Sequence, residues 1–201
     1  MRGAQLAKAR LGGCTFNEVN LRSANLWQAD LQGVDFSGAI LEGANLWGAN
    51  LSRAKLWGAF LDGATLKQAN LTEADLWNAS LNDADIFRAV LRGASLPRAN
   101  LQDAKLMGAD LQNADLKRAD LGRVDLQKAN LRGANLAGAN LQGADLSGAD
   151  LRETKLFAVN LERAILDRAC VLEVEGLTEA QLASTRSHKD AGLPPALRNL
   201  S

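Results

Sequence analysis

Large apolar residues recur at every fifth position of the chain from Leu6 to Leu166. Each of these central residues is Leu, Phe or Ile, with Ile86 as the one Ile, and the register never slips. The residue two positions before each central residue is small and nearly always Ala, with these exceptions: Cys14, Val19, Val34, Val124, Thr154 and Val159. So regular a repeat decides the whole fold and has to be recognised before any residue is assigned to a helix or a strand.

A period of five fits neither regular element. On an α-helix, five residues advance by about 500°, so the central residues would form no apolar stripe. On a continuous strand, an odd step would place successive central residues on opposite faces. The pattern instead predicts a short extended segment and then a corner in each repeat, so that the central and small residues both face inward. Repeated corners wind the chain into a solenoid whose coils bond to one another through their backbones.

The polar residues of the repeat agree with this geometry. Asn or Asp is frequent just before the central residue, where a short polar side chain can bond the backbone of a turn. Gly is frequent two positions after it, where a corner requires dihedral angles that Gly tolerates. Examples are Asn25, Asp30, Asn45 and Asp110 in the first slot, and Gly33, Gly38, Gly58 and Gly133 in the second.

Three runs illustrate a resemblance to a known family: Ala44-Asn45-Leu46, Ala134-Asn135-Leu136 and Ala144-Asp145-Leu146. They resemble the A(D/N)LXX repeat of the pentapeptide-repeat family, and the resemblance covers about four-fifths of the chain. It implies an all-β solenoid, a right-handed quadrilateral parallel β-helix of about eight coils with about 20 residues in each. At a strand spacing of roughly 4.8 Å, the rod would be on the order of 40 Å long.

The repeat pattern divides the chain into two parts. We expect residues 1–170 to form the β-helix and residues 171–201 to form a C-terminal cap. Thr178 and Gln181 predict the capping box of a short α-helix at about 179–185, whose apolar side closes the last coil. The following tail contains Pro194 and Pro195 and is predicted to be extended.

The first coil begins almost at the start of the sequence, so the chain supplies no cap for it. Terminal repeats usually need a covered outer face. Two interpretations follow: the natural chain continues upstream, or two copies form a homodimer through the open N-terminal end.

One outward feature is not required by the interior. The position after the central residue holds every Trp of the chain. With 20 residues per coil, these side chains fall into two columns on opposite faces, and the columns between them are polar. They form a candidate interaction surface, namely Trp27, Trp47, Trp57, Trp77, Phe87 and Met107. The columns are interpreted either as a binding surface, because Trp is enriched at hot spots, or as stacked rings that stabilise the coils.

Charge and hydropathy exclude several classes of function. Lys plus Arg and Asp plus Glu both number 23, so no basic footprint indicates direct nucleic-acid binding. No stretch is apolar enough for a membrane span, and no export signal is present, so the predicted location is cytoplasmic. Two columns of Asp are diluted by Lys residues and are predicted to stabilise turns: Asp85, Asp125, Asp145 and Asp35, Asp75, Asp115, with Lys55, Lys105 and Lys155.

The chain lacks the usual residues of catalytic chemistry. His188 is its one histidine, and no zinc spacing, phosphate-binding loop or dinucleotide fingerprint occurs. Cys14 takes an inward slot and is predicted to be buried, while Cys170 lies at the far end, so no disulfide is expected. We therefore expect no catalytic residue, no metal site, no cofactor and no enzyme activity.

These observations predict a protein-binding or structural scaffold with an unidentified protein partner. The resemblance implies one alternative, because some family members bind type II topoisomerases such as gyrase by mimicking DNA and so protect them from quinolones. Such members look strongly acidic or carry loops and a dimerising C-terminal helix. This chain is neutral and its repeat has no insertion, which favours the scaffold.

Overall fold

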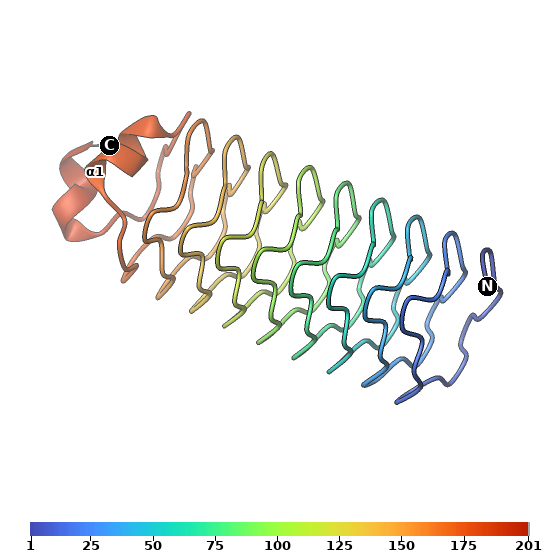
Figure 1. Cartoon of the computed structure of the whole chain (residues 1–201). Coiled ribbons are helices and arrows are strands. Elements are labelled where there is room, and N and C mark those ends of the chain that lie inside the picture. The colour runs from blue at the N-terminus through green and yellow to red at the C-terminus, as the bar shows by residue number, and fades with distance from the viewer. Residues whose placement is uncertain (201) are drawn as a thin grey trace.

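The computed structural model describes residues 1–200, and its repeats wind into a rod of stacked coils (Figure 1). The residue before each central residue forms a parallel bridge with the residue twenty positions later, from Gln5 with Asn25 to Lys155 with Glu175. One coil therefore contains four pentapeptides. The predicted right-handed quadrilateral β-helix is confirmed.

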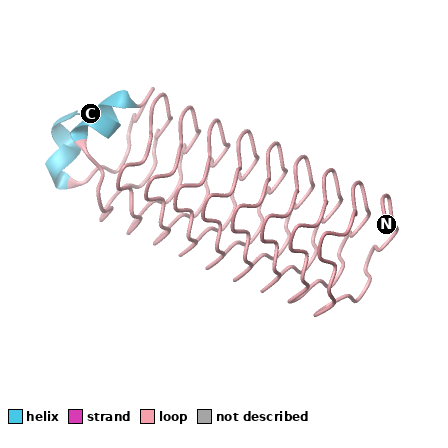
Figure 2. Cartoon of the chain, viewed as in Figure 1, coloured by secondary structure: helices cyan, strands magenta, loops and turns pink. Residues whose placement is uncertain are grey.

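Backbone hydrogen bonds join each coil to both of its neighbours, as residues 26–30 illustrate. The N–H groups of Leu26 and Gln28 donate to the next coil at 2.7 and 2.9 Å, and that of Asp30 donates to the previous coil at 2.9 Å. The Ala29 N–H closes the corner at 3.0 Å. The remaining N–H, of Trp27, donates to the side chain of Asn25 at 3.2 Å. Each face thus contributes one bridging residue, and the coils are drawn as loops in Figure 2.

The corners share one backbone conformation. The second residue after each central residue has a positive φ, as in the third position of a type II turn. Gly58 has φ 60°, and Arg98 and Arg118 adopt nearly the same angle at 58° and 56°. The fold therefore accepts long side chains as well as glycine at this slot.

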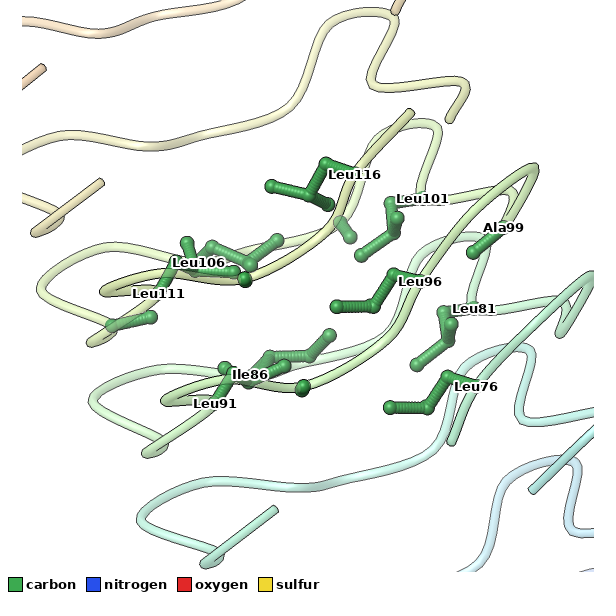
Figure 3. Packing of buried hydrophobic residues seen from close by; sticks show 14 of the residues in the cluster. Leu76, Leu81, Ile86, Leu91, Leu96, Ala99, Leu101, Leu106, Leu111 and Leu116 are labelled. Carbon is green, nitrogen blue, oxygen red and sulfur yellow. The ribbon is translucent and has the colours of Figure 1, made fainter. Parts of the chain in front are cut away.

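The interior is a narrow column of Leu and Ala. From Leu21 to Val171 the central and small residues are buried, and side chains of successive coils lie above one another, as Leu76, Leu96 and Leu116 do in Figure 3. Thr154 is the buried polar residue of this interior, and its hydroxyl donates to the Leu151 carbonyl at 2.6 Å. Each buried Leu contributes roughly 1.5–3 kcal/mol to folding.

The first coil is open on its outer side. Leu6, Leu11 and Phe16 are only partly buried, and Cys14 is exposed. The prediction that Cys14 is buried is therefore wrong. An inward slot is covered by the coils on both sides of it, and the first coil has such a neighbour on one side only.

Helix α1 (Glu179–Ser184) closes the other end. The predicted helix and its capping box between Thr178 and Gln181 are confirmed. The Gln181 side chain also donates to the carbonyls of Leu156 and Val159 at 3.1 and 2.9 Å, and Leu182 is fully buried. The tail then returns to the ladder, where Ser187 and Gly192 bridge the last coil.

The end of the tail forms a 3-10 helix, η1 (Pro195–Leu200), so the prediction of an extended tail is wrong. Proline has the φ of a helical first turn and needs no N–H there, so it can begin a helix as well as break one. The Leu197 N–H donates to the Pro194 carbonyl at 2.9 Å, and the Leu197 side chain is buried. Neither α1 nor η1, the helices of residues 1–200, is long and apolar enough to cross a bilayer.

Candidate interaction surface

The four Trp side chains lie on two opposite corners of the rod. The 20-residue bridge register places Trp27 below Trp47 on one corner and Trp57 below Trp77 on the other. The slot after the central residue points outward at the corner, so these side chains stay outside the core. Trp47 and Trp57 are 44% and 51% exposed, and Trp27 and Trp77 are half-buried.

Rings within each column are in contact. The Trp57 and Trp77 rings are nearly parallel, with centroids 5.5 Å apart and 5° between their planes. The Trp27 and Trp47 rings are 6.2 Å apart and tilted by 48°. Stacking along the rod therefore occurs, but it covers ring faces and leaves the outward edges in solvent.

Cations of the chain itself cover part of the Trp27 corner. The Lys8 ammonium lies 4.7 Å from the Trp27 ring centroid, and Arg88 lies 5.0 Å from that of Phe87. Phe87 and Met107 are half-buried in the same column. The sequence-predicted residues of this corner thus lie together, but they form a mixed cationic and aromatic surface.

Two exposed aromatic residues lie outside the six candidates. Phe60 is 46% exposed and Phe157 is 50% exposed. The sequence pattern places Phe157 in the column of Trp57 and Trp77, and its ring packs against the cap, where a Cβ on Gly176 would lie 2.5 Å from it. Phe60 and Ile40 occupy the slot that usually holds Asn or Asp, and this departure from the repeat is the signal that indicates them.

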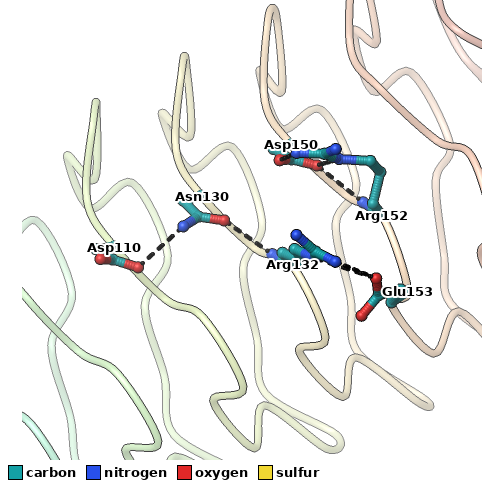
Figure 4. A network of polar contacts seen from close by, with 6 residues as sticks. All are labelled: Asp110, Asn130, Arg132, Asp150, Arg152 and Glu153. Carbon is teal, nitrogen blue, oxygen red and sulfur yellow. Dashed lines mark hydrogen bonds and ion pairs between the residues drawn. The ribbon is translucent and has the colours of Figure 1, made fainter.

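The polar faces are largely neutralised by contacts between coils, as Figure 4 shows. Asn130 donates its amide to Asp110 at 3.2 Å, and Arg132 pairs with Glu153. Arg152 holds Asp150 through paired hydrogen bonds, which lower the pKa of that carboxyl group. Such surface pairs are worth little each, so they fix side-chain positions more than they add stability.

The Asp columns carry partners of opposite charge, as their sequence pattern suggests. Lys55 lies 3.7 Å from Asp35, Lys67 lies 2.9 Å from Asp85, and Lys117 lies 3.7 Å from Asp115. Local turns hold the same carboxylates. Each of these Asp side chains accepts the backbone N–H of the residue two positions later. The donors in the Asp columns include Ser37, Trp77, Lys117, Gln127 and Ser147. Within residues 1–200, no group of three His, Cys, Asp or Glu side chains is placed to hold a metal ion.

A family model now decides the classification. The model for pentapeptide repeats matches eight copies over residues 1–38, 29–68, 49–86, 84–123 and 119–156, well over half of the chain. The chain belongs to the pentapeptide-repeat family.

Several solved pentapeptide-repeat structures are similar to this family member. HetL, involved in heterocyst differentiation regulation in the cyanobacterium Nostoc sp. strain PCC 7120, is 35% identical over 89% of this chain and 88% of HetL, with a TM-score of 0.44. A trypsin-treated form of QnrB1, a plasmid-mediated fluoroquinolone resistance protein, is 20% identical over 98% of this chain and 92% of that chain, with a TM-score of 0.64.

A third relative is a pentapeptide-repeat protein of the Arabidopsis thaliana thylakoid lumen. It is 30% identical over 54% of this chain and 72% of its own, with a TM-score of 0.47. No curated protein matches the chain. The likeness to QnrB1, with the TM-score of 0.64, agrees with the repeat architecture of this pentapeptide-repeat protein.

Proposed function

We propose that this pentapeptide-repeat protein is a non-enzymatic scaffold that docks a protein partner on its aromatic corners. The observation that carries the proposal is the segregation of the Trp side chains to two corners, where Trp47 and Trp57 remain 44% and 51% exposed. Trp is enriched at interaction hot spots, and contiguous exposed apolar patches are uncommon on surfaces without a binding role.

The rest of the architecture supports the same proposal. The repeats run from residue 6 to residue 166 without an inserted loop, so binding groups must lie on the faces, the corners or the ends. A solenoid presents such surfaces as long, rigid arrays. Surfaces of this kind suit a macromolecular partner better than a small ligand.

Affinity capture from native lysate tests the proposal. The parent chain is compared with Trp27→Ser/Trp47→Ser and with Trp57→Ser/Trp77→Ser. Gln32→Ala/Gln112→Ala, on a polar corner between them, is the matched control. We expect one Trp pair to be required for a partner that the parent and the control both retain. Unchanged circular dichroism shows that each variant is folded. Equal capture by all four proteins would refute the aromatic corners as docking sites.

The topoisomerase alternative receives less support from this chain. A DNA mimic needs a continuous acidic surface, whereas Lys55 interrupts one Asp column, and Lys67 and Lys117 pair with Asp85 and Asp115. The likeness to QnrB1 at 20% identity concerns the fold. A gyrase supercoiling assay with a quinolone tests it directly, and we expect this chain to give no protection at micromolar concentration.

A further inference from the structure

The corner that bears Trp57 and Trp77 continues into a second row of apolar side chains, in which Phe60 is exposed and Ile40 is half-buried. Along the chain, Trp57 is followed by Gly58 at the corner, by the buried Ala59, and then by Phe60 on the next face. Ile40 lies one coil below Phe60, with which it forms a bridge. We call the four side chains Ile40, Trp57, Phe60 and Trp77 the Phe60 patch.

Two glycines separate the two rows of this patch and form a glycine strip. Gly38 and Gly58 occupy the corner slot between the rows; a Cβ on Gly58 would meet no atom within 4 Å, and a Cβ on Gly38 would lie 3.2 Å from the Glu18 side chain. Farther along the rod the same slot holds Arg98 and Arg118 with φ of 58° and 56°. Side chains are thus compatible with the slot, and Gly58 leaves room for a ligand to approach the main chain.

Ile40 and Phe60 also lack the hydrogen bond that a polar side chain makes to the backbone at this slot. In most repeats an Asn or Asp at this slot accepts the N–H two residues later, as Asn50 accepts that of Ser52 at 3.2 Å. Ile and Phe side chains have no acceptor. The chain therefore exposes the Phe60 side chain at a slot where a polar residue would stabilise the corner, which is typical of a binding surface.

The surroundings of the Phe60 patch are acidic although the whole chain is neutral. Over residues 35–83, the columns that form and flank the patch carry Asp35, Glu42, Asp62, Asp75 and Asp83. Lys55 pairs with Asp35 and Arg22 pairs with Glu42, so within residues 1–200 the ion pairs leave Asp62, Asp75 and Asp83 to give the patch its acidic surroundings. Asp75 and Asp83 are exposed. The two contacts between cations and rings within residues 1–200, at Trp27 and Phe87, both lie on the other Trp corner.

We propose that the Phe60 patch binds a linear segment of a partner protein that carries Lys or Arg beside apolar side chains. The segment lies along the rod axis over the Gly38–Gly58 strip. Its apolar side chains pack between Trp57 and Phe60. Its cations contact the indole rings and the flanking carboxylates, where they gain both cation–π and ionic interactions. This proposal rests on the scaffold function proposed above and specifies the chemistry of the partner.

The test is a phage-displayed random peptide library selected against the full chain. Enriched peptides are synthesised with a fluorophore and titrated by anisotropy against the parent, Phe60→Ser and Gly58→Arg. Gln112→Ser, on a polar corner outside both aromatic corners, is the control. Gly58→Arg is informative because Arg occupies this slot in two other coils, so the variant fills the strip and preserves the corner.

We expect the enriched peptides to combine Lys or Arg with apolar residues and to bind more weakly as salt is raised. Phe60→Ser and Gly58→Arg should each raise Kd by about tenfold or more, whereas Gln112→Ser should leave it unchanged. Enrichment of acidic or uncharged sequences, an equal loss in Gln112→Ser, or no enrichment would overturn the proposal.

The lysate experiment separates this proposal from the broader one. If capture requires the Trp57 corner but the library yields no such peptide, the scaffold function stands and the cationic linear segment is rejected. If neither experiment shows dependence on an aromatic corner, both proposals fail.

Discussion

At the scale of single residues, Trp57 has two neighbours with different consequences. Its ring is stacked on Trp77, a contact that contributes about 0.5–1.5 kcal/mol beyond the burial of area. On its other side lie the Gly58 backbone and the exposed Phe60 side chain. Stacking accounts for the alignment of the two indoles along the rod, and it leaves the exposure of Phe60 unexplained.

A double-mutant cycle measures the stacking part alone. Trp57→Ala and Trp77→Ala should show a coupling free energy of about 0.5–1.5 kcal/mol in urea unfolding. The control cycle pairs Trp57→Ala with Trp47→Ala on the opposite corner, where the effects should add to within about 0.5 kcal/mol. Additivity in both cycles would show that the parallel rings do not stabilise the rod.

At the scale of elements, the Gln181 side chain makes several of the contacts that hold the short helix α1 on the last coil. This one side chain completes the capping box of α1 and donates to two carbonyls of the coil beneath it. The six-residue helix is too short to be stable by itself, so its contacts with the rod maintain it.

Gln181→Ala should therefore destabilise the C-terminal end by about 1–3 kcal/mol, because it leaves buried carbonyl groups without donors. Hydrogen exchange should accelerate in residues 150–190 and remain slow in the middle of the rod, since each coil contacts only its neighbours. Ser184→Ala, which removes an exposed hydroxyl from the same helix, should change exchange little. Uniform acceleration along the rod would contradict local fraying.

The segment after α1 is held to the rod by a carboxylate. Asp167 accepts hydrogen bonds from the Ser187 hydroxyl and the Lys189 N–H, and chiefly the first lowers its pKa below 3.8. A lowered pKa in the folded state adds stability above the unfolded value, and this stability is lost as the pH falls through the folded value.

Residues 185–192 should therefore be held less firmly as the pH falls below about 4, although their backbone bonds to the last coil remain, and hydrogen exchange or limited proteolysis would reveal the change. Asp167→Asn keeps one carbonyl acceptor and cannot titrate at this position. Its tail should be less firmly held at neutral pH and less sensitive to acid. If Asp167→Asn and the parent chain respond equally to acid, other carboxylates cause the loosening of this segment.

The sequence predicts an element well when that element depends only on residues close to one another in the chain. The period of five determines the coil, and Thr178 with Gln181 determines the start of α1. Two predictions fail because they depend on tertiary surroundings. The burial of Cys14 requires a coil on both sides, and the 3-10 turn at Pro195 depends on the burial of Leu197.

The candidate site is only partly visible in the sequence for a similar reason. The columns of Trp follow from the repeat, but Phe60 joins them only across a corner. The open space beside Gly58 can be recognised only when the residues of the adjacent coils that lie next to it are known. The bridge register supplies this information, and the repeat pattern alone does not.

At the scale of the whole molecule, the two ends of the rod differ. The C-terminal end is capped, whereas the first coil presents partly exposed Leu6, Leu11 and Phe16. In later coils the bridging residue donates its N–H to the coil before it, as Asp30 does to Ala9 at 2.9 Å. Within residues 1–20 the bridging residues donate no such bond.

We propose that two copies meet at this open end. Sedimentation should show a dimer whose population rises with concentration. Leu11→Asp should abolish it, while Gln112→Asp on the side of the rod should not. A monomer at all concentrations would exclude self-association.

The direction of the inter-coil hydrogen bonds also has a mechanical consequence. These bonds run along the rod axis, so a pull on the two ends of the chain would load the bonds of the outermost coil before those of the next. The protein should then lengthen in steps of one coil, each releasing about 20 residues or roughly 70 Å of extended chain. Under such a pull, the rod would thus unfold gradually from its two ends while its middle coils keep their shape.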